Sequence, residues 1–452
     1  MAAPQVVGRH ATSGTHRTGP RNMRGWAVTA MVIALMVINF ADKAVLGLAA
    51  GPIMREFHLT SGEYGAIASS FYLLFSLSAV IVGFVSNRVR TTWILASLAV
   101  LWSLTALPVL LAAGVPALYA SRIALGAAEG PTAPMAVHAV QKWFPERSRS
   151  VPTALINMGG ALGLIVATPL LVHFITHHGW RSAFAVLAAA GLIWVVVWAF
   201  VGREGPLATY GAAAHGTGDG TTTRDTAATR DTAAAREEPH VSYRRLFLNG
   251  TWLGTLAAGI GAYWTLALGV AWLPAYLERG LGYNAAAAGN LVVIPHIVSA
   301  VVLLGIPWIT GRWMRNGATG RIARGITGGL VVSTAGVCML ALPHTEGGVA
   351  VLLMAVAFGL PSALFPLNFL IGAQVVPVRR RGAVLSTGTA LVTLAGVVAP
   401  AVTGRIIDAA ASADAGFQGA FTICAGLLIA GGLIGALCIN PEREARRFGL
   451  TG

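Results

Sequence analysis

The stretch Ser121-Arg122-Ile123-Ala124-Leu125-Gly126-Ala127-Ala128-Glu129-Gly130-Pro131 places an arginine and a glutamate inside an apolar run from about residue 116 to 140. Seven residues make two helical turns, so both side chains project from nearly the same face, about 10 Å apart along the axis. A charge at bilayer depth costs at least ~2.5–3.5 kcal/mol, so this pair predicts a polar cavity or ion-pair partners. Two interpretations follow: a structural ion pair that joins helices, or a binding and proton-coupling site. The rest of the chain favours the second.

The composition indicates a polytopic membrane protein. The 452 residues are 55% hydrophobic and only 11% charged, with a mean hydropathy of +0.70, whereas soluble domains carry about 25% charged residues. The formal charge of +14 is concentrated between the apolar runs, so we expect no nucleic-acid partner. Cys338, Cys424 and Cys438 fall in apolar segments far from any metal-ligand spacing, which predicts small core residues, no disulfide framework and no metal site.

Apolar runs of about 20 residues recur along the chain, and each is long enough to cross the hydrocarbon as a helix. They lie near 26–49, 64–85, 92–113, 116–140, 152–175, 182–202, 251–277, 288–310, 325–343, 349–371, 383–407 and 417–439. This pattern predicts an all-α membrane protein of twelve transmembrane helices in two six-helix halves. Most of the 31 lysines and arginines fall in segments that share one side, so we expect both termini and the central linker to be cytoplasmic.

Five segments are expected. They are a basic cytoplasmic N-tail (1–25), an N-terminal six-helix half (26–202), a cytoplasmic low-complexity linker (203–249), a C-terminal six-helix half (250–440) and a cytoplasmic C-tail (441–452). The linker repeats the hexapeptide Thr-Arg-Asp-Thr-Ala-Ala at 223–234 and is poor in apolar side chains, so we expect it to be mostly disordered. A short amphipathic piece near 241–247 is expected on the membrane surface.

Four ionisable residues lie well inside the expected spans, all in the first half: Asp42, Lys43, Arg122 and Glu129. Two acids and two bases form a neutral set, which lowers the cost of desolvation because each charge can find a partner. Protonation of one acid would free a cation for a substrate anion. This coupling is what a proton symporter requires, so Asp42 and Glu129 are the candidate proton carriers and Arg122 the candidate anion ligand.

Several motifs resemble the major facilitator superfamily, and within it the anion:cation symporter family of galactonate and hexuronate permeases and of sialin and vesicular glutamate carriers. They are Asn39-Phe40-Ala41-Asp42-Lys43, Arg122-x-x-x-Gly126-x-x-Glu129-Gly130, Trp143-Phe144-Pro145-Glu146-Arg147, Trp272-Leu273-Pro274-Ala275-Tyr276-Leu277, Pro377-Val378-Arg379-Arg380-Arg381-Gly382 and Gly396-Val397-Val398-Ala399-Pro400. The resemblance covers nearly the whole chain outside the tails and linker. It implies two pseudo-symmetric halves that rock about a midplane site in the inner, or cytoplasmic, cell membrane, with a monomer as the default state.

The resemblance also implies residue roles. Asp42 and Glu129 would carry protons, Arg122 would bind a substrate carboxylate, and Lys43 would replace the family's first-helix arginine, as a point charge in place of a planar fork. Asn368 occupies a position where sugar-acid carriers place a polar substrate ligand, although an interhelical hydrogen bond is an equal alternative. Tyr72 and Tyr263 are further candidates to line the cavity.

Some positions depart from the family pattern. Phe75 stands where sugar-acid carriers use tyrosine, and Gly160 stands where they often use glutamine. Losing these polar groups predicts a substrate less hydroxylated than a sugar acid, because unpaired hydroxyls in a dry pocket are costly. The signature Gly-x-x-x-Asp-Arg of the superfamily has Asn87 for its acid, and the second-half counterpart at Gly311-Arg312 also lacks one. Because the resemblance assigns to these acids the locking of the outward-facing state, their absence leaves open which conformation this protein prefers.

We therefore expect a proton-coupled importer of an organic anion, a carboxylate, with membrane lipid and protons as its other partners and no cofactor besides the coupling proton. A proton-antiporting exporter of a drug or metabolite has the same fold and stays open. A transporter-like sensor is a third possibility, but the tails offer no signalling domain. An enzyme finds no support, because the sequence has no P-loop, nucleophile elbow or His-Glu-x-x-His motif.

Overall fold

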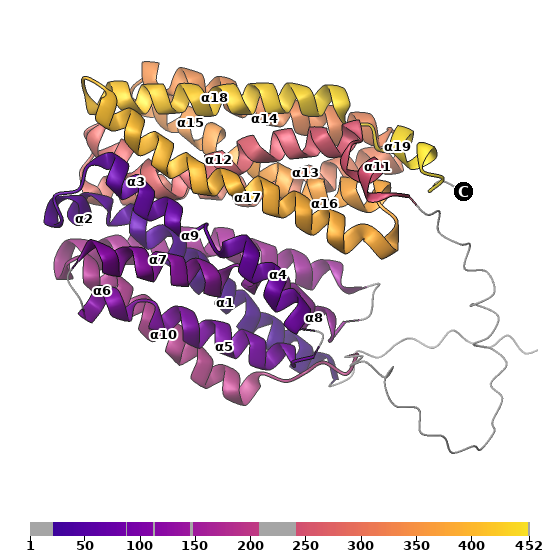
Figure 1. Cartoon of the computed structure of the whole chain (residues 1–452), viewed down its shortest axis with the longest axis horizontal. Coiled ribbons are helices and arrows are strands. Elements are labelled where there is room, and N and C mark those ends of the chain that lie inside the picture. Colours follow the sequence, from indigo (N-terminus) through magenta and orange to yellow (C-terminus); the bar gives the residue numbers. More distant parts are fainter. Residues whose placement is uncertain (1–20, 87, 112–113, 145–147, 208–240, 451–452) are drawn as a thin grey trace, which may run out of the picture.

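The computed structural model describes residues 21–86, 88–111, 114–144, 148–207 and 241–450. Within these ranges the chain is helical and contains no strand. The predicted repeat at 223–234, Asn87 of the cytoplasmic signature and Arg147 lie outside the described residues. The helices form two bundles that lie side by side, the first half below and the second half above in Figure 1.

The first bundle is built from helices that follow the expected spans. They are α1 (Arg21–Leu48), α2 (Ala50–Glu56), α3 (Ser61–Ser70), α4 (Phe75–Val85), α5 (Thr91–Leu104), α6 (Leu107–Leu111), α7 (Val115–Glu129), α8 (Thr132–Gln141), α9 (Ser150–His178) and α10 (Trp180–Val201). The pairs α3–α4, α5–α6 and α7–α8 are each one expected span interrupted by a short break.

The second bundle contains the remaining helices. They are α11 (Tyr243–Phe247), α12 (Gly250–Arg279), α13 (Ala285–Arg315), η2 (Arg321–Ile326), α14 (Thr327–Ala341), η3 (Leu342–His344), α15 (Gly347–Gly359), η4 (Leu360–Ala363), α16 (Leu364–Val375), α17 (Val378–Ala409), α18 (Ala413–Cys438) and α19 (Pro441–Arg447).

Eleven segments of the described chain are long and apolar enough to cross a membrane. The expected span at 116–140 is not among these segments: it is divided at Gly130-Pro131 into α7 and α8, and it contains Arg122, Glu129 and His138, which lower its mean hydropathy. Both break residues keep helical backbone angles, and the break arises because Pro131 has no N–H to donate to the preceding turn. The prediction of twelve transmembrane helices in two halves is therefore confirmed.

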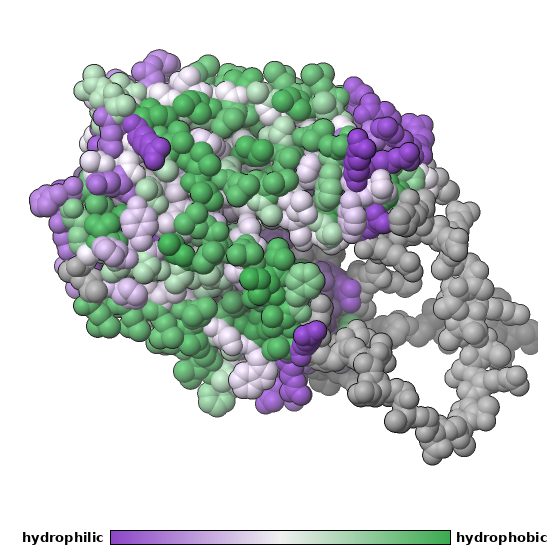
Figure 2. All heavy atoms as spheres, viewed as in Figure 1, coloured by the Kyte–Doolittle hydropathy of each residue, from purple (hydrophilic) through white to green (hydrophobic). Residues whose placement is uncertain are grey.

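The outer surface of the bundles carries large apolar side chains. Leu111, Phe200 and Leu437 are more than 70% exposed, and Figure 2 shows apolar residues along the flanks with polar residues gathered at the two ends. This distribution is the one expected of a surface in contact with lipid acyl chains.

The two halves touch most closely at the end of the molecule away from residues 203–207 and 241–249, which we call the closed end; the opposite end is the linker end. A Cβ added at Gly404 of α17 would lie 2.1 Å from the Ser61 carbonyl oxygen of α3, and one at Gly65 would lie 2.3 Å from the Pro400 carbonyl oxygen. Only glycine permits such an approach of two helix backbones. Asp408 adds an acceptor, since its carboxylate takes hydrogen bonds from the backbone N–H of Ser61 (2.8 Å) and of its neighbour in α3 (2.6 Å).

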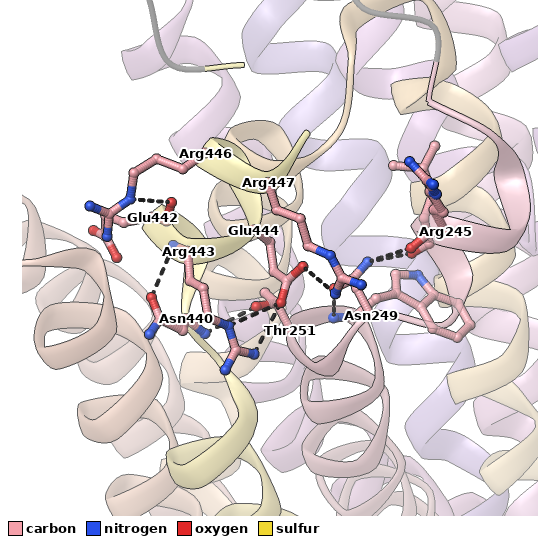
Figure 3. Close-up of polar contacts among 11 residues, drawn as sticks. Arg245, Asn249, Thr251, Asn440, Glu442, Arg443, Glu444, Arg446 and Arg447 are labelled. Carbon is pink, nitrogen blue, oxygen red and sulfur yellow. Dashed lines mark hydrogen bonds and ion pairs between the residues drawn. The ribbon is translucent and has the colours of Figure 1, made fainter. Parts of the chain in front are cut away.

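At the linker end, α11 and α19 pack beneath the second half. Leu246 of α11 is fully buried with Val375, Val376 and Phe448, so the apolar side of the 241–247 segment meets protein, in contrast to the expected membrane surface. Figure 3 shows the polar contacts that hold α19 in place. The Glu442 carboxylate accepts hydrogen bonds from the N-terminal backbone N–H groups of η2.

Of the remaining contacts in Figure 3, one joins α19 to α12 and others lie within α19. The Asn440 N–H donates to the Thr251 hydroxyl at 3.0 Å, and the Asn440 side chain caps α19 through the N–H of Arg443. Glu444, which is 1% exposed, forms ion pairs with Arg443 (3.0 Å) and Arg447 (3.7 Å). The C-terminal segment is thus an ordered part of the second half.

Candidate functional site

The buried charges of the first half meet between α1 and α7. Lys43 Nζ lies 3.0 Å from Glu129 Oε2, and the Glu129 side chain has no exposed surface. Lys43 also donates a hydrogen bond to Asn39 Oδ1 at 2.5 Å. Asn39 precedes Lys43 by four residues, so both lie on one face of α1. The lysine ammonium is therefore held between a carboxylate and an amide.

Two aromatic rings surround the same ammonium. Lys43 Nζ lies 4.3 Å from the centre of the Phe40 ring and 5.8 Å from that of Phe75, distances at which a cation is attracted to the face of a ring. Phe40 also covers Gly160 of α9, because a Cβ added there would lie 2.8 Å from Phe40 Cε2. The Phe40 ring thus fills the space beside Gly160, the position at which sugar-acid carriers often have a glutamine.

Arg122 differs from Lys43 because it has no paired carboxylate. It is 3% exposed, its guanidinium forms no hydrogen bond or salt bridge with any described residue, and its Nε is buried without a partner. Its guanidinium carbon lies 5.2 Å from the centre of the Phe184 ring. Asp42 is 8% exposed, forms no salt bridge within the described ranges, and lies within electrostatic range of Arg122, Lys43 and Glu129. A buried guanidinium with unused donors has the charge and the geometry that suit an anion.

Arg122 and Lys43 open into one cavity, which we call the charged cavity. It has an empty volume of about 360 Å³. Its walls come from both halves and are otherwise apolar or aromatic: Lys43, Leu46, Gly47, Ala68, Phe71, Tyr72, Arg122, Ala267, Val270, Ala271 and Pro400. Among the described residues that line this cavity, the cationic ones are Lys43 and Arg122.

Small residues of α7 position the aromatic wall of the charged cavity. A Cβ at Gly126 would lie 1.7 Å from the Phe71 carbonyl oxygen, and one at Gly130 would lie 1.9 Å from the Phe75 carbonyl oxygen. The Gly-x-x-x-Gly spacing therefore lets α7 press against the break between α3 and α4. This contact fixes Tyr72 and Phe75 beside the charges, so the motif that carries Glu129 also shapes the cavity.

A larger cavity lies in the second half, between α12, α16 and α17, and we call it the apolar cavity. Its empty volume is about 820 Å³. Tyr263, Phe365 and Asn368 line it, together with aliphatic and threonine side chains that extend to the linker end. Asn368 Oδ1 is buried without a hydrogen-bond partner, and its Nδ2 lies 3.5 Å from the Thr255 carbonyl oxygen. In Figure 2 the surface is hollowed between the halves on the side of the linker end.

The structure thus sorts the predicted site residues into groups. Lys43, Arg122 and Tyr72 line the charged cavity; Tyr263 and Asn368 line the apolar cavity. Glu129, Asp42 and Phe75 line neither cavity, although Glu129 and Phe75 both contact Lys43. The two tyrosines connect the residues of one cavity to those of the other, since the ring centres of Tyr72 and Tyr263 lie 5.9 Å apart in an edge-to-face contact.

Sequence reasoning missed three contributors to the site. Asn39 and Phe40 hold Lys43, and Phe184 underlies Arg122. The spacing of four between Asn39 and Lys43 was a usable signal for the first, whereas the approach of Phe184 from α10 depends on helix packing that the sequence does not display. The described residues contain no cluster of three or more histidine, cysteine or acidic side chains that could hold a metal ion.

Comparisons with known proteins agree with this architecture. The family model of the Major Facilitator Superfamily matches residues 32–400. The D-galactonate transporter of Escherichia coli is 27% identical over 394 residues, covering 85% of this chain and 89% of that protein. A probable sulfoacetate transporter of Cupriavidus necator is 26% identical over 420 residues, covering 91% and 93%.

A solved structure shares the fold. It is a bacterial homologue of the human lysosomal transporter Spinster, in an inward-facing and occupied conformation, with a TM-score of 0.73 at 15% identity over 95% of this chain and 99% of that one. The family model and these relatives are all of transporters, and the relatives are bacterial. The chain is accordingly a multi-pass protein of the cell membrane.

Proposed function

The chain belongs to the Major Facilitator Superfamily, and we propose that within it the protein is a proton-coupled symporter that imports an organic anion. The substrate we propose is a carboxylate less hydroxylated than a sugar acid. The observation that carries the proposal is the buried Lys43–Glu129 ion pair beside an unpaired Arg122, with both cations facing one cavity. One relative is a D-galactonate transporter and another is a probable sulfoacetate transporter, and both compounds are organic anions. These relatives support an organic anion as the substrate class.

Charge balance supplies the coupling. With Asp42 and Glu129 ionised, the four buried groups sum to zero, so an added anion would be an uncompensated buried charge. Protonation of Glu129 removes the partner of Lys43 and leaves a net charge of +1. A monovalent carboxylate bound to Arg122 and Lys43 then restores neutrality. Binding of one proton therefore favours binding of one anion. Either one bound alone would leave the buried site with a net charge.

The proposed direction follows from the two ends of the molecule. We propose that the linker end faces the cytoplasm, as the distribution of lysine and arginine predicts. The described state would then be closed to the outside by the α3–α17 contact and would release substrate and proton inward. Rocking of one half against the other would open the closed end, as alternating access requires.

The test is uptake into proteoliposomes of radiolabelled carboxylates, from D-galactonate and sulfoacetate to succinate, with and without an acid-outside pH gradient. Protein-free liposomes correct for passive entry of protonated acids. We expect the gradient to accelerate uptake of at least one carboxylate with few hydroxyls. Movement of cationic or neutral compounds against the proton flow, with no carboxylate uptake, would instead establish the exporter.

A further inference from the structure

Among the side chains that the structure describes, those that line the apolar cavity carry no formal charge: none is an aspartate, glutamate, lysine, arginine or histidine, and the bulk comes from Trp252, Phe365, Phe369, Leu385 and Val392. The charged cavity, in contrast, receives both of its cations from the first half. Charge and apolar surface are thus divided between the two halves of the transporter.

Several polar side chains in the apolar cavity are already used within the protein. The hydroxyls of Thr255, Thr389 and Thr393 donate to carbonyl oxygens of their own helices at 2.8–3.0 Å. Asn249 accepts from the backbone N–H of Trp252 at its Oδ1 and donates through its Nδ2. Asn368 Oδ1 is the buried acceptor on this wall that lacks a partner among the described residues. Among the described residues, the Tyr263 hydroxyl, Trp252 Nε1 and Asn368 Oδ1 are the free polar groups of this wall, which are fewer than the hydroxyls of a polyol need.

The two cavities adjoin at one aromatic contact. Tyr72 lines the charged cavity, Tyr263 lines the apolar cavity, and their rings meet edge to face at 5.9 Å. Next to this contact, the hydroxyls of Ser76 and Thr393 are hydrogen-bonded across the halves. The tyrosine pair therefore lies where the two cavities adjoin. A ligand held at Arg122 could then extend past the tyrosines toward Phe365 and Asn368.

We propose that the two cavities form one substrate site, and that its ligand is a carboxylate with an aliphatic or aromatic body that bears few hydrogen-bonding groups, for which Asn368 Oδ1, the Tyr263 hydroxyl and Trp252 Nε1 are the free partners. This inference rests on the part of the proposed function that places the carboxylate at Arg122. The apolar body gains from leaving water. A polyhydroxylated acid of the same length loses hydrogen bonds to water that this wall does not replace.

The test measures binding in place of uptake, because protonated monocarboxylic acids cross bilayers unaided. Isothermal titration calorimetry on the purified full-length protein compares propionate, 3-phenylpropionate and D-gluconate. We expect 3-phenylpropionate to bind about tenfold or more tightly than either of the others. Gluconate bound as tightly as 3-phenylpropionate would overturn the inference while leaving symport intact. Selective binding without proton-driven uptake would uphold the inference and contradict the symport proposal.

A matched pair of variants on α17 locates the binding surface. Val392→Trp places a large side chain in the apolar cavity, whereas Leu394→Trp places the same side chain two residues away, at a 54% exposed position that does not line it. The affinity ratio of 3-phenylpropionate to propionate should fall about tenfold in Val392→Trp and stay within about twofold in Leu394→Trp. Equal ratios in both variants would overturn the inference, and the wild-type series decides the question if Val392→Trp does not fold.

Discussion

The contact between the halves at the closed end depends on glycine, and replacement of Gly404 by alanine perturbs it by an amount that can be calculated. The new Cβ would lie 2.1 Å from the Ser61 carbonyl oxygen, 2.7 Å from the Ser61 carbonyl carbon and 2.9 Å from the Gly62 Cα. All three atoms are backbone, so no side chain can rotate away. Ordinary contact begins at about 3.4 Å, and α3 and α17 must separate by about 1 Å.

The cost falls on one conformational state. Overpacking of this kind costs about 1–3 kcal/mol, and it applies only while the closed end is shut. The separation also lengthens the hydrogen bonds from Ser61 and Gly62 to Asp408. A difference of 1–3 kcal/mol shifts a two-state equilibrium about 5- to 150-fold. Gly404→Ala should therefore move a large share of the population to the state in which this end is open.

Electron–electron double resonance measures the shift. Spin labels at His178 and Ala411, exposed sites of the two halves near the closed end, are introduced in a background without the native cysteines. We expect a longer distance to gain population in Gly404→Ala. The control is Gly426→Ala on α18, where an added Cβ has nothing within 4 Å. An unchanged distance distribution in Gly404→Ala, or the same change in Gly426→Ala, would refute the reasoning.

Three further perturbations test parts of the same account. Asp408→Asn should shift the same distance distribution toward opening by less than Gly404→Ala, because a neutral amide oxygen is a weaker acceptor for the helix N–H groups. Glu442→Ala removes the cap at Arg321 and should lower the melting temperature by a few °C, a loss of about 0.5–2 kcal/mol measured by thermal denaturation in detergent. Hydrogen bonds from Arg181 and Trp180 hold the pKa of Glu56 below its usual range, so this carboxylate contributes stability above its unfolded pKa and loses it as pH falls through the lowered folded value. The difference in melting temperature between wild type and Glu56→Gln should accordingly shrink as the pH falls below about 4, and a difference that stayed constant or grew with falling pH would contradict the assignment.

Most of the fold could be predicted because each span is a nearly continuous apolar run and the bilayer fixes its minimum length. The break at Gly130-Pro131 is the instructive exception. The proline was visible in the sequence, but a run of apolar residues carries no information on where the hydrogen-bond ladder stops. The packing of α11 and α19 was missed for a related reason. Short amphipathic helices look alike whether their apolar side meets lipid or, as for Leu246, protein.

The site was predictable as a set of residue types and not as a set of contacts. Two acids and two bases in apolar runs indicated a neutral group, because buried charges must be compensated. Lys43 pairs with Glu129 and leaves Arg122 free because of the way α1 and α7 cross. This crossing cannot be predicted from one sequence. Asn368 was grouped with the charges, whereas the structure places it in a second cavity beyond the tyrosine pair.

Coupling through Glu129 is the central claim, and comparison of exchange with accumulation in Glu129→Gln tests it most directly. Proteoliposomes preloaded with a transported carboxylate report exchange without a gradient, and an acid-outside gradient reports accumulation. The account predicts that Glu129→Gln keeps exchange, since its neutral side chain mimics the protonated carboxyl and leaves Lys43 free for the anion, but loses gradient-driven accumulation. Accumulation equal to that of wild type in Glu129→Gln would contradict the account.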